Sequence, residues 1–356
     1  MQARLGDYIQ EYSVRNKENE DIPVYSVTNT QGFCQDYFDK EVASKDKSTY
    51  KIVPRGYFAY NPSRINVGSV DWQRDEDQAI VSPLYNVFSV SSQLDQQYLY
   101  YYLKSDFALQ RIRAVATGSV RDNLKLAMLY EFPINLPDME SQIEVVKKLD
   151  GVKRVISLRE QELKTLDDLI KARFVEMFGD VIRNDKGWNQ YVFSDIATSR
   201  LGKMLDAKKQ TGKYKYPYLA NFNVQWFRLE LENLNEMDFN EADQKEFKLE
   251  EGDLLVCEGG EIGRCAVWHN EIQPCYFQKA LHRVRCNTDV VLPDYLARWF
   301  QYNCEHGGFT AIEGAKATIS HLPGAKLKLL KVTVPPIELQ EHFVSFVAQV
   351  DKSKLL

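Results

Sequence analysis

Basic, aromatic and amide side chains alternate between residues 200 and 228, a combination suited to contact with an extended polyanion. Lysine and arginine side chains bind phosphate groups, and asparagine can hydrogen-bond to the edge of an adenine base. The segment therefore predicts a contact with duplex DNA, while a pair of soluble strands joined by a lysine-rich turn is the alternative interpretation. The candidate DNA-binding residues in this segment are Lys203, Lys208, Lys213, Asn221 and Asn223.

Two glycine-containing loops, Thr117–Arg121 and Gly314–Thr318, each combine a flexible backbone with a cation and a hydroxyl group. We predict that these loops contact bases or phosphates, because such groups suit both kinds of contact. The supply of polar candidates is thinner in the first half of the chain. The further candidates, from these loops and from the polar segments around them, are Arg55, Asn61, Arg64, Ser119, Arg121, Lys125, Arg264, Lys316, Thr318 and Ser320.

The sequence motifs of common catalytic sites are absent or weak. The chain has no P-loop, no G-x-G-x-x-G, G-x-S-x-G or H-E-x-x-H motif, and no C-x-x-C pair. Asn61-Pro62-Ser63 is similar to the N-P-P-aromatic motif of adenine methyltransferases, but Arg64 stands where that motif has its base-stacking aromatic residue. Cys257, Cys265 and His269 have spacings that fit no common zinc site, which favours buried free thiols. We predict no catalytic residue and no metal site.

The length of 356 residues and the hydrophobic content of 44 % predict two globular domains with buried cores. The sequence shows neither a signal peptide nor an apolar stretch long enough to cross a membrane, so a cytoplasmic location is expected. The six cysteines, five of them in the second half, do not resemble a secreted disulfide framework. Reduced thiols are expected.

The net charge of −5 by itself argues against a nucleic-acid partner. The charge is segregated, however, because residues 230–262 contain twelve acidic and two basic residues. The rest of the chain is therefore basic, and the argument against DNA disappears. This pattern favours a basic face with acidic side chains turned away from it, and a solvated acidic loop is the alternative.

The chain is an imperfect duplication with an offset of about 196 residues, as five pairs of segments occur in the same order in both halves. GYFAYNPSRINVG at 56–68 parallels GDLLVCEGGEIGR at 252–264, and both predict a turn, a short apolar strand and a polar loop. LDQQYLYYYLKS at 94–105 parallels LPDYLARWFQYN at 292–303, and both have apolar residues at helical spacing. Two copies of one domain are therefore predicted.

Residues 140–178 contain no proline and a single glycine, and they predict one long helix of about 58 Å. Its apolar residues recur every seven positions, which is typical of a coiled-coil seam that needs a partner helix. Residues 336–356 are the natural partner, but they reach only about half that length, so we expect a truncated chain or an unpaired end. The predicted partner-helix seam consists of Leu149, Ile156, Leu163, Leu166 and Ile170.

Both copies end alike, in LPDMESQ at 136–142 and VPPIELQ at 334–340, each a proline-containing turn followed by Glu-x-Gln and a helix. The long helix ends in LIKARFVEMFGD at 169–180. With the repeat arrangement, these segments resemble the specificity subunit of type I restriction-modification systems (HsdS), over essentially the whole chain.

This resemblance implies a mixed α+β fold, in which a long coiled-coil helix separates two repeated globular target-recognition domains. A shorter C-terminal helix is expected to pack antiparallel to the long one. The implied boundaries place the two recognition domains at 1–138 and 181–335, the long central helix at 139–180, and the start of an apparently truncated C-terminal helix at 336–356.

The resemblance also implies the function: reading a bipartite site in double-stranded DNA, one half per globular domain, and docking two methyltransferase subunits on the helices. Restriction subunits would complete the complex. The chain itself would be non-catalytic, and S-adenosylmethionine, ATP and Mg would bind to the partner subunits. The alternative is a coiled-coil interaction scaffold whose globular domains bind proteins and have no sequence-specific role on DNA.

Overall fold

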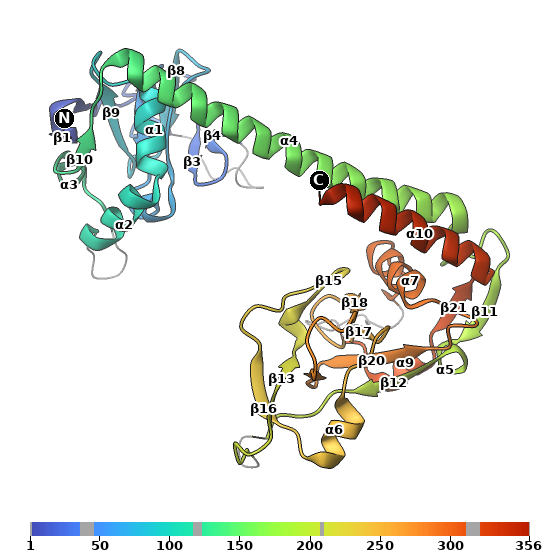
Figure 1. Ribbon diagram of the computed structural model, residues 1–356. Coiled ribbons are helices and arrows are strands. Elements are labelled where there is room, and N and C mark those ends of the chain that lie inside the picture. Colours follow the sequence, from blue (N-terminus) through green and yellow to red (C-terminus); the bar gives the residue numbers. More distant parts are fainter. Residues whose placement is uncertain (1, 36–45, 117–122, 207–209, 311–320, 356) are drawn as a thin grey trace. The chain divides into compact units, whose positions relative to one another are not determined.

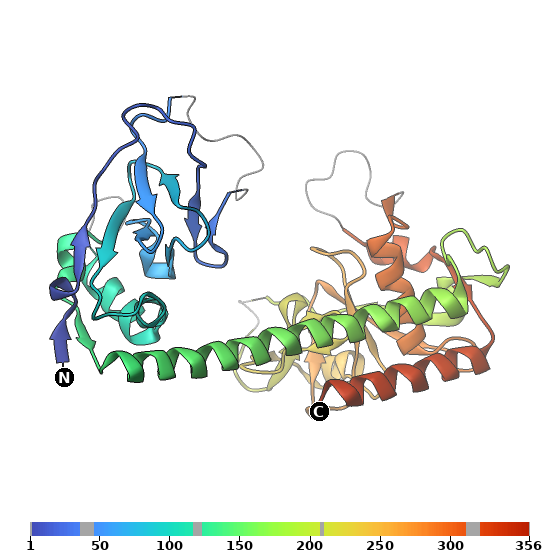
Figure 2. The ribbon, with the colours of Figure 1, turned by 90° about the horizontal axis from the view of Figure 1, so that it is seen from above.

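The computed structural model describes residues 2–35, 46–116, 123–206, 210–310 and 321–355. Contacts within the chain divide it into two compact units, Met1–Arg159 and Glu160–Leu356, here called unit 1 and unit 2. The division falls inside α4 (Met139–Phe178), a helix of 40 residues (Figures 1 and 2). Because it falls within a helix, the predicted domain boundaries at 138, 180 and 335 stay predictions.

Unit 1 is built around an antiparallel four-stranded sheet with the strand order β2-β9-β6-β7. The two-stranded sheets β1-β10, β3-β4 and β5-β8 accompany it. The elements are β1 (Gln2–Arg4), η1 (Leu5–Asp7), β2 (Ile9–Glu11), β3 (Ser26–Thr28), β4 (Gly32–Cys34), β5 (Lys51–Pro54), β6 (Phe58–Tyr60), η2 (Ile65–Val67), β7 (Val70–Trp72), β8 (Gln78–Val81), β9 (Asn86–Val90), α1 (Gln96–Lys104), α2 (Asp106–Val115), α3 (Leu126–Tyr130) and β10 (Pro133–Asn135).

Unit 2 has an antiparallel four-stranded sheet with the order β12-β20-β17-β18, and a three-stranded sheet with the order β16-β13-β19. The pairs β11-β21 and β14-β15 complete its strands in the described part of the chain. The elements after α4 are β11 (Asn189–Val192), α5 (Phe193–Ile196), β12 (Ala197–Leu201), β13 (Lys215–Leu219), η4 (Asn221–Asn223), β14 (Val224–Gln225), β15 (Arg228–Leu229), β16 (Asn235–Asp238), α6 (Glu241–Phe247), β17 (Leu254–Cys257), β18 (Cys265–Val267), β19 (Tyr276–Phe277), β20 (Leu281–Cys286), α7 (Pro293–Glu305), α9 (Gly324–Lys328), β21 (Lys331–Val334) and α10 (Ile337–Lys354).

The two units repeat one topology, which confirms the duplication predicted from the sequence. The strand order β2-β9-β6-β7 corresponds to β12-β20-β17-β18, and β1-β10 corresponds to β11-β21. Helix α1 packs beside β7 as α7 packs beside β18. Even a parallel pairing recurs, between Val24 and Ile80 in unit 1 and between Tyr218 and Tyr276 in unit 2.

The main core of each unit lies between its four-stranded sheet and the helices that follow the sheet. In unit 1, Phe58 and Phe88 stack in this core with ring centroids 5.1 Å apart, beside Leu99 of α1. In unit 2, Tyr295 of α7 lies against Phe174 and Phe178 of α4. The end of the long helix is therefore part of the core of unit 2.

One buried glutamine fastens the start of each terminal helix to its domain. Gln142 is fully buried; its amide nitrogen donates to the carbonyls of Gln93 and Pro137, and its oxygen accepts from the backbone N–H of Asp95, all at 2.9 Å. Asp95 is the N-cap of α1, so a single side chain joins the α1 start, the preceding turn and α4.

Gln340 makes the same three contacts in unit 2. Its amide nitrogen donates to the carbonyls of Val290 and Pro335 at 3.0 and 2.8 Å, and its oxygen accepts from the N–H of Leu292 at 2.9 Å. It is also fully buried. The Glu-x-Gln motif is therefore conserved between the two halves of this chain because each glutamine satisfies three buried backbone groups.

Helix α10 packs antiparallel to the end of α4, as expected. Phe343 lies 5.5 Å from Phe174 and 5.4 Å from Phe178, while Lys354, eleven residues later, forms an ion pair of 2.7 Å with Asp167. Residue numbers thus rise along one helix as they fall along the other (Figure 1).

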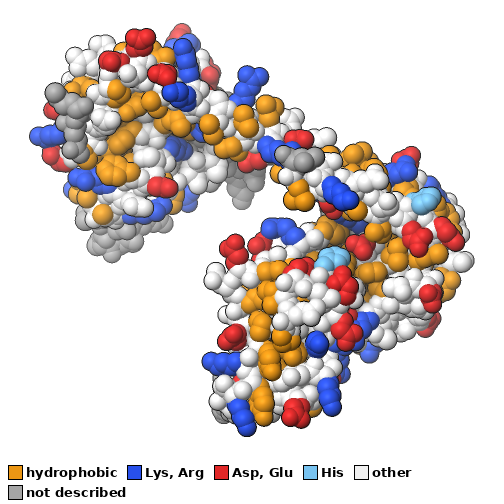
Figure 3. Space-filling view, in the orientation of Figure 1, with side chains coloured by type: hydrophobic (Ala, Val, Ile, Leu, Met, Phe, Trp, Pro, Cys, Tyr) orange, Lys and Arg blue, Asp and Glu red, His pale blue; other side chains and the backbone are white. Residues whose placement is uncertain are grey.

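Only part of the predicted seam lies under α10. Ile170 is fully buried and Leu166 packs against the core of unit 2, while Leu163 is half-buried. Leu149 and Ile156 are 38 % and 52 % exposed, so nothing in the described part of the chain covers them. Figure 3 shows hydrophobic side chains at the surface along the course of α4. None of the described helices is long and apolar enough to span a membrane.

We expect Gln142→Ala to lower the free energy of unfolding of unit 1 by about 2–4 kcal/mol, because it leaves three buried backbone groups without partners. Urea unfolding, followed by circular dichroism, measures this loss. Gln161→Ala is the control, since Gln161 is exposed on the same helix. Equal stability of the two variants would contradict the role of Gln142.

Candidate functional site

In unit 1, the candidate residues Asn61 and Arg64 lie in the loop between β6 and β7. The Asn61 side-chain oxygen accepts hydrogen bonds from the backbone N–H and the hydroxyl of Ser63, at 3.1 and 2.9 Å. Gly68 ends the loop with φ of 90°, a left-handed conformation that favours glycine. The loop is therefore held by its own backbone and by Asn61, and Arg64 is exposed at its surface.

The segment that follows the gap at 117–122 is attached to the same loop. The N–H of Leu124 donates to the carbonyl of Pro62 at 3.1 Å, and its carbonyl accepts from the Tyr60 hydroxyl at 3.0 Å. Leu124 is buried, whereas Lys125, next in the chain, is exposed. The candidates Lys125 and Arg64 therefore belong to one surface. Ser119 and Arg121 lie outside the described residues.

Unit 2 repeats this arrangement with different side chains. The N–H of Leu322 donates to the carbonyl of Glu258 at 2.6 Å, and His321 pairs with Gly259 across an antiparallel bridge. His282 lies beneath, 3.0 Å from the Leu322 carbonyl, and burial lowers its pKa. The loop between β17 and β18 is thus the counterpart of the Arg64 loop. Lys316, Thr318 and Ser320 lie outside the described residues.

The structure brings Asn221 and Arg264 together at this loop. The Asn221 amide donates to the carbonyl of Gly259, and the Arg264 guanidinium donates to the carbonyl of Asn221, both at 3.1 Å. Asn221 Oδ1 and Arg264 Nε are buried and have no hydrogen-bond partner among the described residues. Asparagine and arginine are the side chains that pair with the edges of adenine and guanine, so this is the strongest base-reading pair in unit 2.

Two candidates have structural tasks instead. Asn223 is 1 % exposed; its oxygen accepts from the N–H of Ala220 and its amide donates to the carbonyl of Glu230, both at 2.9 Å. Lys203 donates to the carbonyl of Asp238 and forms an ion pair of 2.6 Å with Asp243. Since these contacts occupy both side chains inside the domain, neither is available to a ligand, and their selection as DNA contacts is corrected here.

The acidic segment 230–262 neutralises cations of its own domain. Glu246 forms an ion pair with Arg200, and Asp253 and Glu250 form ion pairs with Arg285 at 2.7 and 3.1 Å. The expectation that the acidic side chains turn away from a basic face therefore needs correction, because several of them face the cations. Figure 3 shows side chains of both charges intermixed on unit 2.

The candidates that keep an exposed cation are fewer as a result. Lys213 is exposed, with its ammonium group 5.3 Å from the centre of the Tyr214 ring. Arg55 is exposed too, but it forms an ion pair of 3.2 Å with Asp77. Lys208 lies outside the described residues. Lys213, together with Arg64 and Lys125, is thus best placed for phosphate contact.

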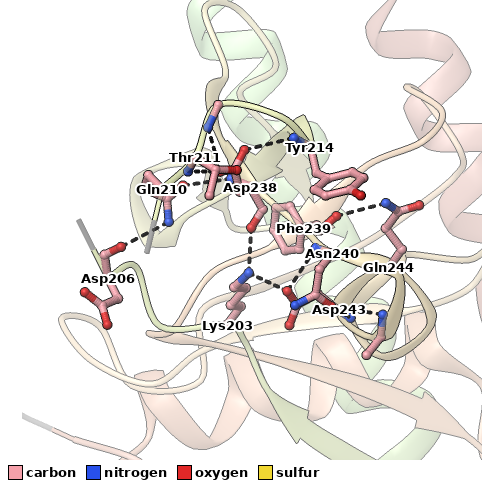
Figure 4. A network of polar contacts seen from close by, with 12 residues as sticks. Lys203, Asp206, Gln210, Thr211, Tyr214, Asp238, Phe239, Asn240, Asp243 and Gln244 are labelled. Atoms are coloured by element: carbon pink, nitrogen blue, oxygen red, sulfur yellow. Dashed lines mark hydrogen bonds and ion pairs between the residues drawn. The ribbon is translucent and has the colours of Figure 1, made fainter. Parts of the chain in front are cut away.

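The loop that carries Lys213 is held by Asp238, which the sequence analysis did not select (Figure 4). The Asp238 carboxylate accepts hydrogen bonds from the backbone N–H groups of Thr211, Gly212 and Tyr214 and from the Thr211 hydroxyl. The last three measure 2.8, 3.1 and 2.9 Å. Three successive N–H donors on one carboxylate fix the backbone beneath Lys213.

The protonation of Asp238 reflects these contacts. Burial raises its pKa, but the hydrogen bonds from Thr211, Tyr214 and Gly212 outweigh burial and hold the pKa below its usual value. The carboxylate is therefore ionised at neutral pH and acts as an acceptor only. Lys203 supplies the nearby positive charge, since its ammonium group donates to the Asp238 carbonyl.

Phe222 is a second residue that the sequence analysis missed. Its side chain is 57 % exposed in the turn between Asn221 and Asn223. An exposed aromatic ring beside base-reading groups can stack on a base. Its position within an Asn-Phe-Asn tripeptide was the available signal, although exposure cannot be read from sequence.

The structure contains no arrangement suited to metal binding in the residues that it describes, as no three His, Cys, Asp or Glu side chains converge there. The thiols of Cys257 and Cys265 are buried and free. Burial raises the pKa of Cys257 to about 11, so this thiol is protonated at neutral pH.

A family model described as the type I restriction modification DNA specificity domain matches residues 6–168 and 185–356. The chain belongs to this family. Its two matches fall on the two structural repeats, which are therefore the two target-recognition domains of a specificity subunit.

Two curated members of the family are similar in sequence. A putative type I restriction enzyme specificity subunit from Haemophilus influenzae is 24 % identical over 271 residues, which cover 73 % of this chain and 65 % of the relative. The EcoKI specificity subunit from Escherichia coli is 19 % identical over 364 residues, which cover 96 % and 78 %. The chain thus spans just under two thirds of the length of the first relative.

Solved structures share the fold. A type I restriction-modification structure concerned with complex assembly and conformational transition covers 100 % of this chain and 90 % of its own, with a TM-score of 0.57 and 16 % identity. The S subunit from M. genitalium covers 99 % and 90 %, with a TM-score of 0.54 and 14 % identity. The predicted fold class is thereby confirmed.

We expect Asp238→Asn to loosen the loop, because the amide cannot accept all four hydrogen bonds that the carboxylate accepts. Amide hydrogen exchange at Thr211, Gly212 and Tyr214 should accelerate by about tenfold, as charge-assisted bonds are lost. Glu236→Gln on the same strand, where the side chain is exposed, is the control. Unchanged exchange in the Asp238 variant would refute the assignment.

Proposed function

We propose that this chain recognises a bipartite site in double-stranded DNA, with one half read by each unit. The observation that carries the proposal is the recurrence of one surface in both units: a loop between the third and fourth strands of the sheet, tied to a buried leucine. Unit 1 presents Arg64 and Lys125 there, and unit 2 presents Asn221 and Arg264. Different side chains on one scaffold suit two different half-sites.

The chain would act as a reader without catalysis of its own, and α4 would hold the two readers apart. Methyltransferase subunits would dock on its helices, with restriction subunits in the full complex. S-adenosylmethionine, ATP and Mg would then bind to those partners. This division of labour fits the described residues, which offer exposed cations and amides at the loops but no paired acid and base there.

The interaction scaffold remains the second candidate, favoured by the exposed apolar side chains of α4. Val152, Val155 and Leu158 are 58 %, 66 % and 55 % exposed. A helix with such a surface binds other helices. The scaffold alternative predicts assembly without sequence-specific DNA binding, so a binding assay distinguishes the two.

The chain assembled with its methyltransferase subunit should bind a cognate duplex more tightly than a scrambled one at moderate salt. Asn221→Ala should relax discrimination at one base pair by about 1–3 kcal/mol, because a bidentate base contact is lost. Lys213→Ala should weaken both duplexes alike and reduce the salt slope by about one. Fluorescence anisotropy over a salt series measures both.

Lys164→Ala, which removes an exposed cation from α4, is the control for the charge change. If the assembled wild-type protein bound cognate and scrambled duplexes equally, the proposed function would be wrong, since phosphate contacts carry no sequence information.

Lengthening α4 should change the distance between half-sites and leave their sequences unchanged. Seven helical residues inserted after Val152, where the helix is exposed, add about 10 Å, or about three base pairs. Seven residues also return the helix to nearly the same face. Methylation mapping of a genomic library reads the preferred spacing.

A seven-residue insertion between the exposed residues Glu232 and Asn233 is the control, because it lengthens the chain outside α4. Unaltered spacing in the α4 variant would show that the helix does not set the distance.

A further inference from the structure

Arg298 of α7 is a buried cation with an unusual set of neighbours. Its side chain is 7 % exposed, its guanidinium lies 3.4 Å from the centre of the Phe227 ring, and one nitrogen donates to the Gln301 oxygen at 3.2 Å. Phe227 adopts a left-handed φ of 62°, which an aromatic residue rarely takes. The turn before β15 thus covers one face of Arg298.

No carboxylate contacts this guanidinium among the described residues, within the 4.0 Å of an ion pair. Asp351 and Asp167 act on it through space, but both are ion-paired with Lys354, at 2.8 and 2.7 Å. Burial lowers the pKa of Arg298 to about 10, so the group is still charged at neutral pH. A buried charge without a contacting counter-charge is costly, and a purely structural arginine would normally be paired.

Arg298 lines a pocket between α4 and α7, inside unit 2. The pocket has a volume of about 240 Å³, and Phe174, Val175 and Tyr302 form apolar walls. At its rim, Lys171 and Glu305 pair with each other at 2.7 Å, so Glu305 does not neutralise Arg298. Val175 is 43 % exposed at the mouth. The pocket therefore connects a buried cation with the surface of α4.

The size and lining of the pocket restrict its ligand. Sites for cofactors and other small molecules usually have about 300–1,000 Å³, so this pocket is too small for a nucleotide. It has room for one side chain of a partner. A guanidinium stacked on an aromatic ring selects a carboxylate, with which arginine forms two parallel hydrogen bonds.

We propose that the Arg298 pocket receives an aspartate or glutamate side chain of a protein that docks on α4 and α7. This inference rests on the proposed function, under which the docking protein is the methyltransferase subunit. The carboxylate would supply the missing counter-charge, and the apolar walls would hold its methylene groups. Such a contact would be buried in the interface, where arginine contributes strongly to binding.

The pocket can be tested on the isolated chain by supplying the carboxylate from within. Val175→Glu places an acid at the exposed mouth, and Val175→Gln is the matched neutral control. Glutamate should raise the melting temperature by about 2–4 °C over glutamine, because it pairs with Arg298. The difference should disappear when Arg298→Met is added, as a double-mutant cycle measures. No coupling between the two positions would overturn the proposal.

Binding of the methyltransferase subunit, measured by calorimetry, is the second test. Arg298→Met should weaken binding at least about tenfold without lowering the melting temperature, since an unpaired buried charge is removed. Val175→Glu should weaken binding more than Val175→Gln, because its own acid occupies the pocket. Lys164→Ala, on the exposed surface of α4, should bind as the wild type does.

The results separate the two proposals. If the wild-type chain does not bind the methyltransferase subunit, the proposed function fails. If it binds, but Arg298→Met binds equally well, the function stands and the pocket has no such role. A lower melting temperature with a matching loss of binding in Arg298→Met would make Arg298 a structural residue and overturn the inference.

Discussion

The buried amides of Gln142 and Gln340 are the constraint on which the rest of the structure depends. Each amide satisfies one N–H and two carbonyls where a turn, a domain helix and a terminal helix meet. An apolar side chain could not replace it, because three backbone groups would stay buried without partners. Each long helix therefore leaves its domain from one defined point, and the recognition loops are built on the same sheet that this point anchors.

The two ends of α4 are stabilised in different ways. In unit 2, Phe174 and Phe178 belong to the core and α10 covers them, so the helix end is part of the domain. In unit 1, Lys153 lies 5.0 and 4.9 Å from the rings of Tyr100 and Tyr101, a contact at the domain surface. Between these ends, apolar side chains remain exposed on α4, which suits a helix that other chains can contact.

The duplication, the long helix and the pairing of α10 with α4 could all be predicted from the sequence. Periodic and repeated patterns are local signals, and they persist because each half must build the same core. The candidate site was predicted only in part. Asn221 and Arg264 do converge, but Lys203 pairs with Asp243 inside the domain. Asp238 escaped notice because an acidic residue in an acidic segment looks like surface.

What the sequence by itself determined is therefore the architecture: two copies of one domain, a helix between them and a family motif at each domain end. Only the tertiary structure decided which polar side chains face outward. Asn221 and Asn223 are two residues apart and chemically identical, yet one lies at the loop surface and the other is sealed under Glu230. Arg298, hidden in an ordinary amphipathic helix, acquires its meaning from Phe227, distant in sequence. Composition and spacing report local preference, whereas burial and pairing depend on contacts that form only when distant segments meet.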